Sequence, residues 1–286
     1  MARVIFSNYV SEIYCIAPSV GAEASLEDYK AAFALSETLD IAAVVCASED
    51  EEVLLALKES VERASQSGRE RIAFGGAGQV ANQNTVGAKA LAQALDSERF
   101  CLAAPRVNYN GQESSVWLAA AYAALVTASD DPSANLNSSV ISGEFVFPEA
   151  FTEENIDSLI EGGVAVFENL SGNTELIRAI TTRQPQGGAA FHELSSVRIT
   201  DDVISSVRAM LKDRLRGLKN SESARESIKS QVTIELENKK KQNIISAYDA
   251  PVVYPKENEP TVCVVEIGFT LMYAVHQIHL TAFVEV

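Results

Sequence analysis

The feature that most constrains this chain is an alternation of short apolar runs with amphipathic segments, which continues to about residue 130. The runs IAAVVCAS (Ile41–Ser48) and RFCLAAP (Arg99–Pro105) are continuous, as in strands that are covered on both faces. Between them lie amphipathic helical patterns, such as EDEEVLLALKESVERASQSG, which ends at Gly68. This alternation predicts an α/β fold with a mixed, largely parallel core sheet flanked by helices.

The pattern changes after DPSANLNSS. FTEENIDSLIEGG predicts a short helix, and VAVFENLSGNTELIRAITTR predicts two strands across a turn. Long helices over Asp201–Leu218 and Ser221–Glu237 precede the strand-like runs TVCVVEIGFTLM and YAVHQIHLTAFVEV. We therefore expect an α+β C-terminal domain, and three parts in all: an N-terminal arm strand over 1–20, an α/β core over 21–185 and a C-terminal domain over 186–286.

Both ends of the chain have the composition of β-strands. The segments are Ala2–Pro18 and Tyr273–Val286, which are rich in Val, Ile, Tyr and Phe. An unpaired strand edge offers its backbone groups to another chain. The sequence therefore predicts that both ends could be free strand edges. The residues that we expect to form these arms are Val4, Ile5, Phe6, Tyr9, Val10, Ile13, Ile278, Leu280, Ala282, Phe283 and Val284.

Composition and charge exclude several classes of function. The formal net charge of −16 argues against non-specific nucleic-acid binding and against anionic membranes. The longest apolar stretch, VWLAAAYAALV, is too short to cross a bilayer, and MARVIFSN is too polar for a signal peptide. Each of the four cysteines stands alone in an apolar run, so we expect buried, reduced thiols. A reducing, aqueous compartment follows from these features.

The sequence offers no constellation of residues that predicts catalysis. FGGAGQ (Phe74–Gln79) lies between a strand and a helix, where a phosphate-binding turn would sit, but it lacks a third fingerprint glycine and a P-loop Lys-Ser/Thr. His276 and His279 point to opposite faces of a strand and cannot share one metal ion. We expect no catalytic, cofactor-binding or metal-binding residues and no cofactor. A nucleotide-binding α/β enzyme remains the alternative.

Basic residues gather in one region. Arg198–Lys241 contains eleven Lys or Arg residues and seven Asp or Glu residues, against an acidic remainder. The run Lys239, Lys240 and Lys241 closes a predicted helix, where cations interact favourably with the helix dipole on a solvated face. The second interpretation is a contact with an acidic partner.

In their order, these segments resemble the contractile tail sheath proteins of bacteriophages and related injection machines. The resemblance covers roughly residues 25–286. It rests on EDYKAAFALSETLD, RERIAFGG, the stretch from RFCLAAPRVNYNGQ to SSVISG, and VRITDDVISSVRAMLKDRL. Its most specific part is FTEENIDSLIEGGVAVFENLSGNTELIRAITTR.

The resemblance implies a structural subunit without enzymatic activity. Such subunits form hexameric rings that stack into a helical sheath around an inner tail tube protein, with baseplate and tail terminator proteins at the ends. Contraction drives the tube through the target cell envelope. The resemblance also implies that terminal strands are available for inter-subunit β-augmentation. It implies a virion that is assembled in the bacterial host cytoplasm, with no nucleic-acid contact and no membrane insertion. Lys239, Lys240 and Lys241 would face the tube. A non-contractile scaffold or ring protein is a further alternative.

Overall fold

The computed structural model describes residues 1–19, 23–80, 84–185, 189–214 and 219–273. The chain divides into two compact units. Unit 1 comprises residues 1–130 and 136–197, and unit 2 comprises residues 131–135 and 198–286. The division falls inside a helix, whereas the sequence placed the start of the C-terminal domain at residue 186. Each unit is described by itself below.

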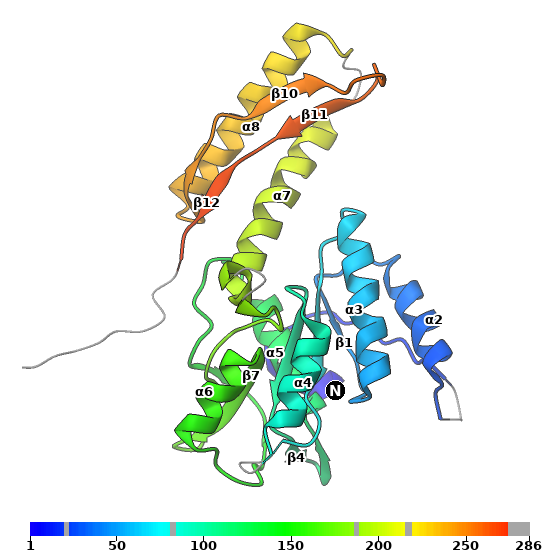
Figure 1. Ribbon diagram of the computed structural model, residues 1–286, viewed down its shortest axis with the longest axis vertical. Helices are drawn as coiled ribbons and strands as arrows, with labels where there is room; N and C mark the ends of the chain where they lie inside the picture. The colour runs from blue at the N-terminus through cyan, green and yellow to red at the C-terminus, as the bar shows by residue number, and fades with distance from the viewer. Residues whose placement is uncertain (20–22, 81–83, 186–188, 215–218, 274–286) are drawn as a thin grey trace, which may run out of the picture. The chain divides into compact units, whose positions relative to one another are not determined.

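Unit 1 is built on a mixed sheet with the strand order β1-β2-β3-β7-β8-β6 (Figure 1). The first four strands are parallel, and the last two run antiparallel to their neighbours. The strands are β1 (Ala43–Val45), β2 (Ile72–Gly76), β3 (Phe100–Ala104), β7 (Val164–Leu170), β8 (Asn173–Leu176) and β6 (Ser139–Ile141). The predicted α/β fold with a largely parallel sheet is therefore confirmed, as is the predicted hairpin, which is β7 and β8.

Helices cover both faces of this sheet. One face packs on α5, and the other contacts α3, α4 and α6. Helices α4 and α6 lie in front of the sheet in Figure 1. Helix α2 packs on α3. The helices are α1 (Ala2–Ser7), α2 (Leu26–Ser36), α3 (Glu51–Gln66), α4 (Val86–Leu95), α5 (Val116–Ala128), α6 (Glu153–Glu161) and η2 (Ala189–His192). Side-chain caps at Ser25, Asp50 and Thr152 accept backbone N–H bonds at the starts of α2, α3 and α6.

The centre of unit 1 is an aromatic cluster between α5 and the sheet. The Tyr122 ring meets Phe74 and Phe167 edge-on, with centroids 5.1 and 5.8 Å apart. The buried Tyr122 hydroxyl donates to the Ile180 carbonyl over 3.2 Å. Gly75 lets Leu54 of α3 approach the strand, because a Cβ on Gly75 would lie 2.9 Å from the Leu54 side chain. Strand, helix and aromatic packing thus form one core that is closed on both faces of the sheet.

The structure corrects several local predictions in unit 1. Strand β1 is only half-buried and lies at the edge of the sheet, so the run Ile41–Ser48 is not covered on both sides. The predicted N-terminal strand begins instead as helix α1. The hairpin of β4 (Val107–Tyr109) and β5 (Gln112–Ser114) was missed. Its signal was the Asn110–Gly111 dipeptide, in which both residues have positive φ.

Unit 2 consists of two long helices and a bent two-stranded ribbon. Helix α7 (Leu194–Arg214) crosses from unit 1, and α8 (Glu222–Lys241) is capped by Ser221. The ribbon pairs β9 (Ile245–Tyr248) with β12 (Phe269–Leu271), and β10 (Val252–Pro255) with β11 (Cys263–Glu266). The Asp249 N–H donates to the Gly268 carbonyl at the bend and joins the two halves. The predicted α+β character of this domain is confirmed.

Among the described residues, no helix combines the length and the apolar character that a bilayer crossing requires.

Candidate functional site

The glycine-rich turn after β2 is occupied by the protein's own side chains. The Gly78 N–H donates to Ser115 Oγ over 2.9 Å, and the Ala77 N–H donates to the Ala103 carbonyl. Glu49 accepts from the Ser115 hydroxyl and backbone N–H, both over 2.7 Å. A carboxylate therefore lies beside the turn, and two N–H groups that could cradle a phosphate have internal acceptors. The turn positions α5 and the β4–β5 hairpin.

The histidines and cysteines form no reactive cluster in the described part of the chain. His192 is buried, and its Nδ1 lies 2.9 Å from the Arg183 carbonyl. His276 and His279 lie outside the described residues. No group of three or more His, Cys, Asp or Glu residues in the described ranges could hold a metal ion. Burial is as predicted for Cys46 and Cys101 and raises the pKa of both thiols, whereas Cys263 is half-buried and Cys15 is exposed.

The N-terminal arm residues differ in burial, and Ile5, Val10 and Ile13 are half-buried. Val4 on α1 is buried, with 1% of its surface exposed, and α1 contacts α5. Phe6 and Tyr9 are 49% and 86% exposed. Residues 10–17 form no strand. The strand prediction failed here because the outer face of α5 is apolar and is covered by a helix.

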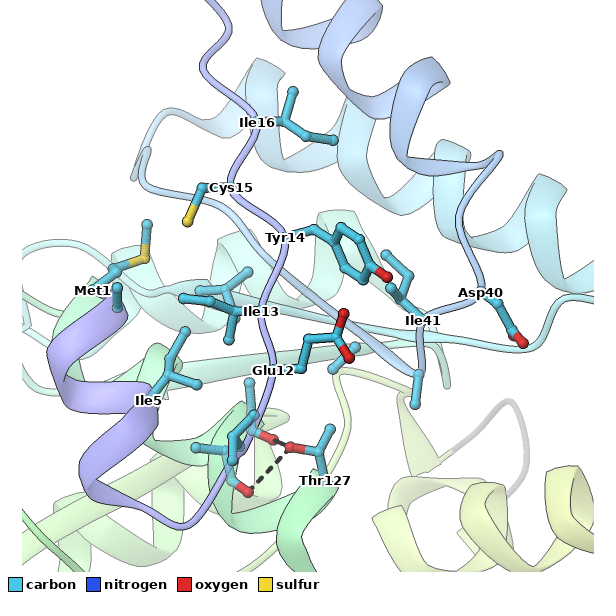
Figure 2. Close-up of a pocket in the computed structure, with 17 residues that line it drawn as sticks. Met1, Ile5, Glu12, Ile13, Tyr14, Cys15, Ile16, Asp40, Ile41 and Thr127 are labelled. Carbon is cyan, nitrogen blue, oxygen red and sulfur yellow. Dashed lines mark hydrogen bonds between the residues drawn. The ribbon is translucent and has the colours of Figure 1, made fainter.

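A cavity of about 460 Å³ separates the extended segment that follows α1 from the edge of the sheet. Figure 2 shows Glu12, Ile13, Tyr14 and Cys15 along this segment, with Ile5 of α1 on one side and Ile41 on the other. Ala43 and Val45 of β1 and Ala123 and Ala124 of α5 complete the apolar part of the lining. The cavity thus lies directly on the open edge of β1.

Unit 2 presents a second open edge. Neither β11 nor β12 pairs with a further strand among the described residues. A groove of about 680 Å³ runs between α7 and β11. Its lining is apolar apart from two basic residues, and consists of Ile204, Val207, Arg208, Leu211, Lys212, Val265 and Ile267. An apolar groove beside an open strand edge can accept an extended segment.

The three lysines that end α8 have different surroundings. Lys239 is buried, and its Nζ donates to Asp202 Oδ2 over 2.7 Å. Lys240 and Lys241 are exposed, and Lys240 Nζ lies 5.9 Å from the centre of the Tyr248 ring. Lys239 is therefore an internal ion-pair partner and does not belong to an exposed basic surface. A tube contact by Lys240 and Lys241 stays a prediction.

The C-terminal arm residues Ile278, Leu280, Ala282, Phe283 and Val284 lie outside the described residues. The predicted role of both arms stays a prediction.

The Thr181–Thr182 pair, which stands near the end of the most specific part of the resemblance, lies in the core of unit 1. Both residues are fully buried. Thr182 Oγ1 accepts from the Ser97 N–H and donates to the Ser97 carbonyl, and the Thr181 hydroxyl donates to the Phe191 carbonyl. The Thr182 bonds fasten the chain that follows β8 to the loop before β3, and the Thr181 bond fastens it to η2. The role of the pair is therefore to hold the fold.

Two family models match this chain over most of its length. The central domain of phage tail sheath proteins matches residues 22–182, and the C-terminal domain of these proteins matches residues 186–285. None of the curated proteins compared matches the chain.

Several solved structures share the fold. The sheath tail protein of Desulfitobacterium hafniense is 13% identical with a TM-score of 0.66, over 87% of this chain and 61% of that one. The sheath complex of an extracellular contractile injection system (PVC), in its contracted state, is 16% identical with a TM-score of 0.67, over 87% and 72%. The contracted helical sheath of the anti-feeding prophage is 12% identical with a TM-score of 0.67, over 90% and 74%. The chain thus spans about three fifths of the Desulfitobacterium protein.

Proposed function

The chain belongs to the phage tail sheath family, a family of structural proteins, and from this premise we propose that it is the contractile sheath subunit of a phage-type tail. Subunits form hexameric rings, and the rings stack into a helical sheath around an inner tube. Contraction repacks the subunits into a shorter, wider helix and drives the tube through the target envelope. The free energy is stored in the metastable extended assembly, so no catalytic site is needed.

The observation that carries this proposal is the open strand edge of unit 2 beside an apolar groove. Residues 273–286 have strand composition and follow β12 closely in the chain. In the assembly, this segment of one subunit adds a strand to the β11–β12 edge of a neighbour, and its apolar side chains enter the groove of that neighbour. Backbone hydrogen bonds of this kind hold subunits together while the surrounding domains re-pack.

The partners follow from the same role. The subunit binds copies of itself, the tube protein, and the baseplate and terminator proteins that lie at the two ends of the sheath. Lys240 and Lys241 face an acidic tube surface, where exposed ion pairs are weak enough to break on contraction. The protein is assembled in the host cytoplasm and becomes part of the virion.

Electron microscopy of the purified chain tests the proposal. We expect hollow, ribbed cylinders of uniform width, because the contracted polymer is the stable form. Leu280→Pro should abolish them, since proline removes one backbone donor from the added strand, and Leu280→Val should preserve them. Monomers at high concentration, even with tube protein present, would contradict the proposal.

A non-contractile scaffold or ring protein would use the same strand edge. It would give cylinders with a single helical form, with and without the tube. The nucleotide-binding alternative is disfavoured by the geometry of the turn after β2, where Glu49 binds Ser115 and the Gly78 N–H is already bonded. A nucleotide that raised the melting temperature of the chain would restore this alternative.

A further inference from the structure

The glycine-rich run Phe74–Gln79 makes room for one serine at the start of α5. Strand β2 ends at Gly76, and a Cβ on Gly76 would lie 2.3 Å from Ser115 Oγ. Gly78 has φ +71°, a conformation that glycine adopts without strain, and its N–H donates to the same Ser115 oxygen over 2.9 Å. Ser115 is fully buried. These two glycines therefore seat Ser115 against the end of the strand.

The carboxylate of Glu49 receives the donors around Ser115. Its Oε1 accepts from the Ser115 N–H over 2.7 Å, from Ser115 Oγ over 2.7 Å and from Ser114 Oγ over 2.8 Å. Its Oε2 lies 3.6 Å from Nε of Arg106. That Nε is buried and has no hydrogen-bond partner within the described ranges. Three donors and one cation thus surround the two carboxylate oxygens, and hydrogen bonds to an ionised acceptor are stronger than neutral ones.

These residues lie where open α/β sheets bind their ligands. Glu49 follows β1, Gly78 follows β2 and Arg106 follows β3, and these three strands are adjacent and parallel. Ligands of such sheets lie beyond the carboxyl ends of the strands, and anions are favoured at the N-terminus of a helix. Helix α5 begins at Val116, directly after Ser115. The arrangement is therefore that of an anion site with a side chain of the same chain in it.

We propose that this end of the sheet is an oxyanion-binding site and that Glu49 is its resident ligand. The site takes a small anion with acceptor oxygens, because the groups around Oε1 and Oε2 are hydroxyl, amide and guanidinium donors. Since Glu49 fills the site, the native chain binds no free carboxylate or phosphate there.

The bound carboxylate holds the β4–β5 hairpin to the sheet. Arg106 precedes β4, Ser114 ends β5 and Ser115 follows it, so both ends of the hairpin meet Glu49. Arg106 Nη2 also donates to the Glu113 carbonyl over 2.8 Å, inside the hairpin. All of these residues belong to unit 1. The site acts in the isolated subunit, so its test is separate from that of the sheath.

Chemical rescue of Glu49→Ala by acetate tests the proposal. The substitution removes a CH₂–COO⁻ group, which acetate replaces in size and charge. We expect Glu49→Ala to lower the melting temperature of unit 1 by roughly 5 to 10 °C. Acetate should restore roughly 2 to 5 °C of this loss, relative to chloride at the same ionic strength, and should shift the wild-type chain by less than about 1 °C. Hydrogen exchange of residues 107–114 should quicken at least ~10-fold in the variant and slow again in acetate.

Two further variants and a neutral ligand are the controls. Glu113→Ala removes an exposed carboxylate of the same hairpin and should change neither the melting temperature nor the exchange. Glu49→Gln keeps the site filled, so it should lose less stability and should not respond to acetate. Acetamide, the neutral analogue of acetate, should not rescue Glu49→Ala. Where Glu49→Ala does not fold in chloride, folding in acetate alone is the same readout.

Three results would overturn the proposal. One is an equal effect of acetate and chloride on Glu49→Ala. Another is stabilisation of the wild-type chain by acetate to the same extent as the variant, because Glu49 would then not be the occupant of the site. The third is a Glu49→Ala chain that matches Glu113→Ala in melting temperature and in exchange, because the hairpin would then not depend on the carboxylate.

Discussion

The two units of this chain bury their apolar side chains to different extents. In unit 1, all five residues of β2 and all five of β3 are buried, with helices on both faces of the sheet. In unit 2, no residue of β10 or β11 is fully buried. The unit 2 core is completed by apolar side chains that are only partly buried, namely Met210, Leu211, Tyr248, Val253, Cys263, Val265, Ile267, Phe269 and Leu271.

This difference separates folding from association. A two-stranded ribbon is marginal by itself and depends on packing against helices. Unit 1 covers both faces of its sheet with its own helices, so its stability should depend little on neighbours. Unit 2 leaves strand edges and apolar surface open, as the proposed strand exchange requires. Because the units differ in this way, we expect unfolding in two steps rather than one.

The largest expected effect comes from Phe167→Ala in the aromatic cluster of unit 1. Phe167 is fully buried against Tyr122, and its truncation should cost about 3–5 kcal/mol of unfolding free energy. Urea unfolding should show that the unit 1 transition moves and the unit 2 transition stays. Leu170→Ala, on the exposed end of the same strand, is the control. Equal shifts of both transitions would show that the units fold as one.

A smaller effect is expected at the ion pair inside unit 2. Lys239→Ala leaves Asp202 without its 2.7 Å partner and should cost about 2–3 kcal/mol. Asp202→Ala in the Lys239→Ala background should cost less than it does alone, because the pair is already broken. The two variants and their double mutant, measured by urea unfolding, give the coupling. Additive costs would mean that the two charges act independently.

Lys239 also shows what the sequence could predict. Ile228, Val232 and Leu236 recur at helical spacing along one buried face of α8. Lys239 follows Leu236 by three residues and lies on the same face, so the burial of Lys239 could be predicted from the sequence. The predicted parallel sheet followed from apolar periodicity alone. Helix α1 could not be predicted in this way, because Val4, Ile5 and Phe6 favour a strand locally. Packing against the apolar outer face of α5 stabilises the helix instead.

A third prediction concerns pH and unit 1. Burial opposes ionisation of Glu37, but hydrogen bonds from Arg63 and Ser60 outweigh it and lower its pKa. A lowered folded-state pKa contributes stability above the unfolded pKa, near 4.3, and this contribution is lost as pH falls through the folded value. Glu37→Gln should therefore cost about 1 kcal/mol at pH 7 and less below pH ~4. Urea unfolding at pH 7 and pH 3.5 tests this, and an equal cost at both values would contradict it.

The smallest effect on stability is expected at the exposed end of α8, where the main expected effect is on assembly around the tube. Lys240→Gln with Lys241→Gln removes two solvated charges near the helix C-terminus, and should change the unfolding free energy by no more than about 1 kcal/mol. Neutralising them should weaken assembly around the tube and reduce its salt dependence, since screened surface charges provide the contact. Lys256→Gln, on an exposed lysine elsewhere in unit 2 that pairs with Glu259, is the control. Co-sedimentation with tube protein over a salt series gives the comparison. If the double variant and the control assemble equally well, Lys240 and Lys241 do not contact the tube, and the proposed role of unit 2 in the sheath then rests on its open strand edge.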